Sequence, residues 1–217
     1  MTNNKIKLFT ISAVLASNCL MLSGCESKIS SLEELAKSVC TVYVKQSSRL
    51  CNGTGFLIEG DYIVTADHLF LHYSEIKQID VSFLGLPDKY SAEIVNYDSL
   101  NDIAILKCNE TKKLKKIHIS NQKYDVGDTC YTIGYQNSIT IATSKGIISN
   151  PNCYIDTAYY IESNIYTYSG CSGSPLLNES LECIGVQTKS FSTREGFAPE
   201  FGYAVKAETI RNLLNHL

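Results

Sequence analysis

Short runs of β-branched, aromatic and other apolar residues recur along this chain, and polar turn residues separate them. In the first half the turn sequence Glu59-Gly60-Asp61 divides one run, so that six strands are predicted there, over residues 39–45, 54–65 (two strands), 79–84, 90–97 and 102–107. A second set of six runs covers residues 129–134, 139–149, 153–162, 174–178, 183–190 and 201–205. This length and composition are typical of antiparallel strands.

Two helices are predicted, one on either side of the strand-rich region. Ser31 and Glu34 form a capping box in front of a short amphipathic run. Near the C-terminus apolar residues recur at helical spacing: Ile210, Leu213, Leu214 and Leu217. Residues 108–126, between the two sets of strands, are polar and rich in lysine, which predicts the connection between two halves.

This order of elements predicts an all-β fold of two six-stranded antiparallel barrels followed by a helix. We expect the first barrel over about residues 39–108, the second over about 127–205 and the helix over 206–217. Closed antiparallel sheets have no free edges, and the cleft between two of them can gather side chains from distant parts of the chain.

The first 24 residues are organised like an export signal. Lys5 and Lys7 precede a largely apolar stretch over residues 8–22, and the sequence Leu-Ser-Gly-Cys ends at Cys25. This ending resembles a bacterial lipobox, which implies that Cys25 carries lipid and that residues 25–38 link the anchor to the folded part. The alternative is an ordinary cleaved signal in which Cys25 is incidental. The lipobox interpretation predicts an exported protein that is lipid-anchored in the bacterial cell envelope, on its periplasmic or extracellular face.

Charge and cysteine content exclude several classes of partner. The net charge is −3 over 217 residues, and the densest basic run, residues 112–116, fits a solvated connection, so no nucleic-acid partner is expected. The seven cysteines after Cys25 are widely spaced and include no C-x-x-C pair, so no metal site is expected either. Their odd number leaves at least one thiol unpaired and the pairing open.

The octapeptide from Tyr168 to Pro175 has the composition of a tight turn around one serine. Gly170 and Gly173 lie on either side of Ser172. Such a turn can present the Ser172 hydroxyl to a carbonyl carbon while the N–H groups of Gly170 and Ser172 bind the oxyanion that forms. Because ordinary turns share this composition, the partners of Ser172 decide between the two interpretations.

A candidate base and a candidate carboxylate lie upstream of this turn. The sequence Thr65-Ala66-Asp67-His68 ends a predicted strand with a histidine, whose imidazole suits a general base at neutral pH. Asp102 directly precedes the apolar run 103–106, where it could orient His68 and stabilise the imidazolium. A surface-turn histidine and a turn-capping aspartate are the alternatives.

These motifs, in this order, resemble those of the chymotrypsin-fold serine proteases, especially the compact bacterial HtrA and glutamyl endopeptidase groups. The resemblance covers roughly residues 39–217 and includes further motifs at 53–56, 101–106, 127–134, 146–149, 184–186 and 202–205. It implies hydrolysis of peptide bonds in protein or peptide substrates through an acyl-enzyme on Ser172, with His68 as general base, Asp102 as its orienter and no cofactor. Because the sequence ends at Leu217, no PDZ module is expected.

Cys171 departs from the family pattern directly before the nucleophile, where relatives carry aspartate or asparagine. Activation by cleavage of the chain is therefore not expected. Some viral members of the fold use a cysteine nucleophile, and in them a glycine directly follows that cysteine. Here the residue directly before the glycine is Ser172, not Cys171. We therefore prefer Ser172 over Cys171 as the nucleophile.

The resemblance also implies a substrate pocket between residues 166–169 and 187–190. Tyr166 stands where trypsin-like enzymes have an aspartate, so a preference for basic residues is not supported. Thr167 matches a threonine of the glutamyl endopeptidases, whereas Gln187 stands in place of their histidine. Lys189 would supply positive charge only if it points inward, so the preferred residue stays open.

Two other functions remain alternatives at this stage. One is a catalytically inactive, protease-fold binding or stress-sensing lipoprotein that keeps the triad residues. The other is a redox-gated protease in which Cys171 oxidises or pairs with another thiol. The oligomeric state cannot be predicted from the sequence.

Overall fold

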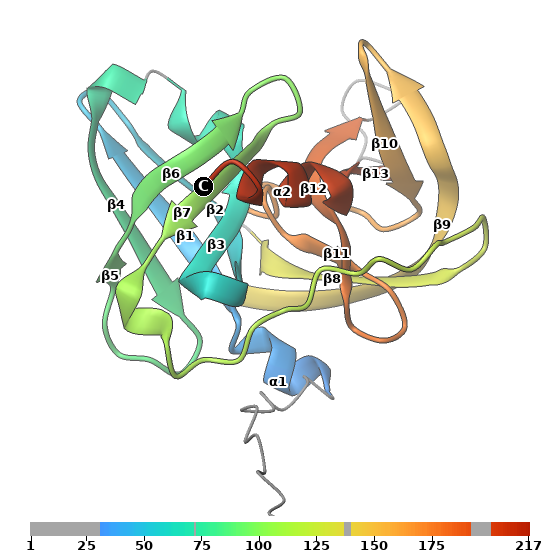
Figure 1. Cartoon of the computed structure of the whole chain (residues 1–217), viewed down its shortest axis with the longest axis horizontal. Coiled ribbons are helices and arrows are strands. Elements are labelled where there is room, and N and C mark those ends of the chain that lie inside the picture. Colours follow the sequence, from blue (N-terminus) through green and yellow to red (C-terminus); the bar gives the residue numbers. More distant parts are fainter. Residues whose placement is uncertain (1–30, 72, 137–139, 192–200) are drawn as a thin grey trace, which may run out of the picture.

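The computed structural model describes residues 31–71, 73–136, 140–191 and 201–217. Two β-sheet units stand side by side, with helix α1 (Leu32–Ala36) below them and helix α2 (Ala207–Leu214) across their junction (Figure 1). Within these ranges no helix is long and apolar enough to cross a membrane. The predicted export signal and Cys25 lie outside the described residues.

The first unit is a seven-stranded antiparallel sheet with the order β5-β4-β1-β2-β3-β7-β6. Its strands are β1 (Val39–Gln46), β2 (Leu50–Ile58), β3 (Tyr62–Ala66), β4 (Ile76–Phe83), β5 (Tyr90–Ser91), β6 (Glu93–Asp98) and β7 (Ile103–Lys107).

A break at Ala92 gives the first unit seven strands, in an order that is not closed, where we predicted a six-stranded closed barrel. The predicted strand 90–97 is divided at Ala92, whose N–H donates to the Ile79 carbonyl at 3.0 Å. The residues before it pair with β4 and those after it pair with β7. One continuous stretch of chain therefore passes from one edge of the sheet to the other.

The second unit is a closed six-stranded barrel with the order β10-β13-β12-β11-β8-β9, as predicted. Its strands are β8 (Thr129–Gln136), β9 (Thr140–Ile155), β10 (Ala158–Ser163), β11 (Pro175–Leu177), β12 (Cys183–Phe191) and β13 (Phe201–Lys206). β9 runs through Pro151, where we predicted a break. The proline lies at a shift in register between β9 and β10, where no main-chain N–H of β9 is required as a hydrogen-bond donor. The β9–β10 turn lies instead at Asp156, whose φ is +55°.

The largest hydrophobic cluster joins the two units. Phe56 and Ile105 of the first sheet pack in one cluster with Ile133 and Val186 of the barrel, and residues of both helices complete it. In α1 the Ser31 hydroxyl accepts the Glu34 N–H at 3.1 Å, which confirms the predicted cap.

Helix α2 is hydrogen-bonded to elements on both sides of the junction. Arg211 donates to the Ser120 carbonyl, in the connection before β8, at 2.8 Å. The Asn96 amide of β6 donates to the Leu213 carbonyl at 2.9 Å. The helix therefore fixes the two units relative to each other.

Candidate active site

His68 and Asp102 meet at one end of the first sheet. His68 lies in the 3₁₀ turn η2 (Asp67–Phe70) that directly follows β3, and Asp102 directly precedes β7. Strands β3 and β7 are antiparallel neighbours with Ala66 opposite Ile103. The residues that follow β3 and the residue that precedes β7 therefore lie at the same end of the sheet.

The Asp102 carboxylate holds the His68 imidazole on one side. His68 Nδ1 lies 2.8 Å from Asp102 Oδ2 and 3.1 Å from Oδ1, and the His68 main-chain N–H donates to Oδ1 at 2.8 Å. A carboxylate at Nδ1 favours the tautomer with the proton on that nitrogen, which leaves the lone pair on Nε2. The His68 side chain is 38% exposed and that of Asp102 only 14%, so the imidazole is accessible while the carboxylate is shielded.

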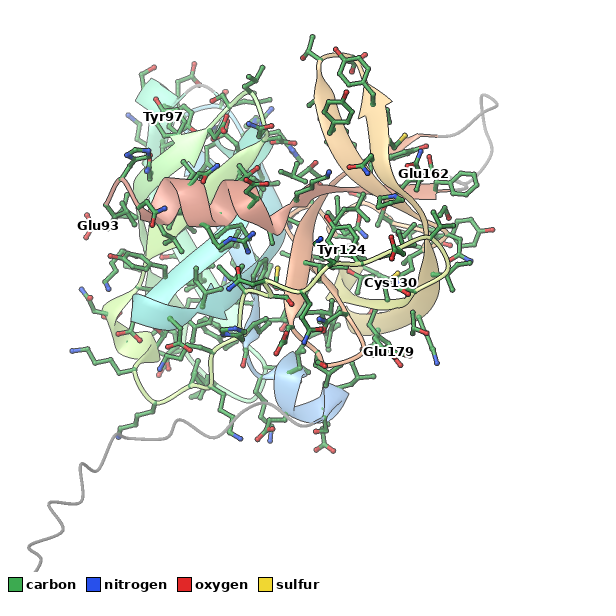
Figure 2. All side chains as sticks on the ribbon, turned by 45° about the vertical axis from the view of Figure 1, so that its right-hand side comes forward. Glu93, Tyr97, Tyr124, Cys130, Glu162 and Glu179 are labelled. Atoms are coloured by element: carbon green, nitrogen blue, oxygen red, sulfur yellow. The ribbon has the colours of Figure 1, made fainter. Side chains whose placement is uncertain are left out.

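Two tyrosines support the turn that carries His68. The Tyr73 hydroxyl donates to the Asp67 carboxylate, next to His68 in the chain. Burial raises the pKa of Tyr73, so its hydroxyl stays protonated and remains a donor. The Tyr73 ring packs against that of Tyr97 with 4.6 Å between centroids, at the end of the first sheet where Figure 2 labels Tyr97.

Ser172 lies in a tight turn between β10 and β11. The Cys171 N–H donates to the Tyr168 carbonyl at 3.0 Å, and the Ser174 N–H donates to the Cys171 carbonyl at 2.9 Å. Gly170 and Gly173 have φ values of +92° and +89°, which favour glycine. In the described part of the chain neither the Gly170 nor the Ser172 N–H donates to a main-chain carbonyl.

Thr54 of β2 anchors this turn to the first sheet. Its N–H donates to the Ser172 carbonyl at 2.8 Å, and its hydroxyl donates to the Gly170 carbonyl at 2.7 Å. The same hydroxyl accepts the Tyr135 N–H of β8 at 2.9 Å. Sequence reasoning used Gly53–Phe56 only as a motif and missed this role. The signal was there, since a polar residue between two glycines in an apolar strand indicates close backbone approach.

Gly173 seats the turn close to the strand end that precedes His68. A Cβ atom on Gly173 would lie 2.0 Å from the Thr54 carbonyl oxygen, 2.5 Å from Thr65 Oγ1 and 2.9 Å from the Ala66 nitrogen. Ser172 is therefore brought next to β3. No hydrogen bond joins its hydroxyl to the His68 imidazole in the described residues. Such contacts are often long in unliganded sites and tighten when substrate binds.

The close approach of Gly173 predicts a large loss of stability in Gly173→Ala. We expect a decrease of about 4 kcal/mol in the free energy of unfolding, because positive φ and overpacking both oppose the methyl group. Gly127→Ala is the matched control, since Gly127 has a φ of +92° but nothing within 4 Å of its Cβ position. It should cost about 1 kcal/mol. Urea unfolding of both variants measures the difference, and equal losses would contradict the steric argument.

Cys171 is poorly placed for chemistry. Its side chain is 5% exposed, and burial raises the pKa of its thiol, so the reactive thiolate is disfavoured. All seven cysteines in the described residues are free thiols. Burial also raises the pKa of Cys130, inside the second barrel, to about 12 (Figure 2). This placement supports neither a cysteine nucleophile nor redox gating through Cys171.

The four residues predicted to line a substrate pocket fall into two groups. Thr167 and Gln187 are buried and converge on Gly202: Thr167 Cγ2 lies 3.3 Å and Gln187 Oε1 3.1 Å from the position that a Gly202 Cβ would take. Tyr166, in contrast, is 52% exposed. Lys189 Nζ lies 3.8 Å from the Asp156 carboxylate at the β9–β10 turn and 5.1 Å from the centre of the Tyr160 ring.

Comparison with known proteins gives consistent similarities. Residues 53–186 match the family model described as trypsin-like peptidase domain. The chain is 29% identical over 171 residues to a probable periplasmic serine endoprotease DegP-like of Chlamydia trachomatis, covering 76% of this chain and 33% of that protein. It is 28% identical over 178 residues to serine endoprotease DegS of Salmonella typhimurium, covering 76% and 48%. The chain thus spans between a third and a half of the length of these relatives.

Solved structures share the fold. The HtrA-type protease AlgW with tripeptide superposes with a TM-score of 0.75 at 22% identity, covering 84% of this chain and 60% of that one. The serine endoprotease from Yersinia pestis gives a TM-score of 0.72 at 24% identity, covering 88% and 67%.

Proposed function

This chain belongs to the family of trypsin-like peptidase domains, and from that membership we propose that it is a serine endopeptidase that cleaves peptide bonds in protein substrates. One observation carries the proposal. The hydrogen-bonded pair His68–Asp102 lies at the end of β3, and the turn that contains Ser172 packs against that same strand end. The similarity to proteins named serine endoproteases supports the same activity.

The proposed reaction proceeds through an acyl-enzyme. His68 Nε2 takes the proton from the Ser172 hydroxyl as its oxygen bonds to the scissile carbonyl carbon, and Asp102 stabilises the imidazolium that forms. The N–H groups of Gly170 and Ser172 hydrogen-bond the oxyanion. The imidazolium then gives its proton to the leaving amine as the C–N bond breaks. Water, deprotonated by the same imidazole, releases the acid and restores Ser172.

The substrate side chain on the amino side of the scissile bond would lie against Thr167 and Gln187. Both residues connect directly to the nucleophile turn: Thr167 precedes it in the chain, and the Gln187 carbonyl accepts the Gly173 N–H at 2.7 Å. Tyr166 and Lys189 would contribute to the outer part of this subsite, because the side chains of both are in part exposed.

We place this activity outside the cytoplasm, in the cell envelope. The predicted export signal supports this location, and so does the similarity to relatives named as periplasmic. The Leu-Ser-Gly-Cys sequence supports a lipid anchor on Cys25. The mass of the mature N-terminal peptide, with or without diacylglycerol on that cysteine, tests the anchor.

A fluorophosphonate probe tests the proposed activity directly. The probe should phosphonylate one residue, and peptide mapping should place the adduct on Ser172. The missing hydrogen bond between Ser172 and His68 would also fit a catalytically inactive binding or stress-sensing member of the fold. That alternative predicts no adduct at all, and an adduct on Cys171 would contradict the assignment of the nucleophile.

A further inference from the structure

A second carboxylate lies directly before the proposed general base. Asp67 is the first residue of η2 and the neighbour of His68 in the chain. It is 7% exposed, and it has no part in the proposed acyl transfer. A buried carboxylate is costly unless other groups hydrogen-bond to it, so the partners of Asp67 restrict how this turn can fold.

Asp102 holds the main chain of the turn. The Asp67 N–H donates to the Asp102 carbonyl at 3.2 Å, and the His68 N–H donates to Asp102 Oδ1 at 2.8 Å. Both bonds start from main-chain nitrogens. They therefore tie the backbone of the turn to the loop before β7, but they leave the Asp67 side chain to other partners.

Tyr73 supplies a partner for the Asp67 side chain. It lies at the start of the next 3₁₀ turn, η3 (Tyr73–Glu75), and its hydroxyl donates to Asp67 Oδ1. The Tyr73 ring stacks on the ring of Phe70 with 6.3 Å between the centroids, and Phe70 is fully buried. The core of the first sheet therefore fixes the donor, and η2 is held through a side chain as well as through its backbone.

The Tyr73 ring also contacts the strand that leads to Asp102. Its centroid lies 4.6 Å from that of Tyr97, which Figure 2 labels near one end of the first sheet. Tyr97 lies in β6, and the end of β6 leads into the loop that contains Asp102. Tyr73 thus joins the turn that carries His68 to the strand that precedes Asp102.

We propose that Tyr73 and Asp67 are positioning residues for His68. The Tyr73 hydroxyl keeps the Asp67 carboxylate in its buried place, and this holds η2 in the conformation that sets the His68 imidazole against Asp102. This inference rests on the proposed peptidase activity. Without the hydroxyl the carboxylate would have to reach water, and a turn that opens for it displaces His68, the next residue. A displacement of about 1 Å can lower a rate about 100-fold.

Tyr73→Phe tests the proposal, because it removes the donor and keeps the ring. We expect kcat to fall about 30-fold while KM stays within about twofold of the wild-type value, since the imidazole acts in bond making and breaking rather than in substrate binding. The rate of fluorophosphonate labelling of Ser172 should fall by the same factor. Steady-state hydrolysis of a peptide substrate by the full chain measures both constants.

A second substitution should restore the activity of this variant. In the double variant, Asp67→Asn together with Tyr73→Phe, the buried group is a neutral amide, which costs much less to leave without a partner than a carboxylate does. The turn then need not open, and kcat should return to within about fivefold of the wild-type value. A Tyr73 hydroxyl that only stabilised the fold would give no such recovery.

Tyr62→Phe is the matched control. Tyr62 lies at the opposite end of β3 from His68, and its ring centroid is 4.4 Å from Lys107 Nζ. Its hydroxyl forms no hydrogen bond within the described ranges. Removing it should leave kcat and KM at their wild-type values. Urea unfolding of all the variants shows that each is folded under the conditions of the assay.

The outcomes separate the positioning role from the activity itself. If the wild type takes the probe on Ser172 but Tyr73→Phe keeps its full kcat, or changes KM instead, the role of Tyr73 and Asp67 alone is overturned. A folded double variant that stays more than fivefold below the wild type overturns it too, even if Tyr73→Phe is unstable. A wild type that neither takes the probe nor hydrolyses any peptide overturns the proposed peptidase activity and this inference with it.

Discussion

Ser172→Ala is expected to lower kcat for peptide hydrolysis by about 10⁵ to 10⁶-fold, because it removes the atom that would carry the acyl group. The fold should be preserved. Ser172 is tied to Thr54 through its main-chain carbonyl, which alanine retains, and no described hydrogen bond uses its hydroxyl. Steady-state hydrolysis of a peptide substrate measures the loss, and urea unfolding shows whether stability is retained.

Ser180→Ala is the matched control for this variant. Ser180 lies exposed in the turn between β11 and β12, where its N–H donates to Asn178 Oδ1 at 3.0 Å. Its hydrolysis rate should equal that of the wild type. If Ser172→Ala kept more than a small fraction of the wild-type kcat while folded, another nucleophile would have to be sought.

Asp102→Asn should lower kcat by about 10⁴-fold with little change in KM. Asparagine has nearly the same shape and tolerates the positive φ of +59° at this position, so the local backbone should persist. The loss comes from the imidazole. Without the carboxylate at 2.8 Å from Nδ1, the His68 tautomer is no longer fixed and the imidazolium is no longer stabilised. The rate of fluorophosphonate labelling should fall together with kcat.

Asp98→Asn separates this chemical effect from a loss of loop structure. Asp98 ends β6, just before the loop that contains Asp102, and its carboxylate accepts the Asn101 N–H at 3.0 Å and the Asn101 side-chain amide at 2.7 Å. We expect less than a tenfold decrease in kcat for this variant, since its hydrogen bonds are structural. Comparable losses in the two variants would argue that Asp102 acts only by shaping the loop.

Local sequence patterns were sufficient for most of the strands. Runs of β-branched residues between turn residues predicted six strands in the second barrel, with the boundary between β9 and β10 misplaced, and the capping box predicted the start of α1. Both features depend on neighbours within a few residues. The break at Ala92 depends instead on pairing with two strands that lie at opposite edges of the sheet, and no local pattern records such a choice.

The candidate site shows the same division. The motifs around His68, Asp102 and Ser172 indicated which residues to consider. Each is a local pattern: a histidine at a strand end, an aspartate before an apolar run, and a serine between glycines. The hydrogen bond from Thr54 to Gly170, by contrast, joins positions 116 residues apart in the sequence.

The anchoring by Thr54 has a consequence for when the site comes into existence. The first half of the polypeptide supplies the groups that hold the backbone of the serine turn, and the second half supplies the turn itself. Neither half can complete the arrangement alone. The serine turn can therefore be held in place only after both halves have been synthesised and have packed against each other.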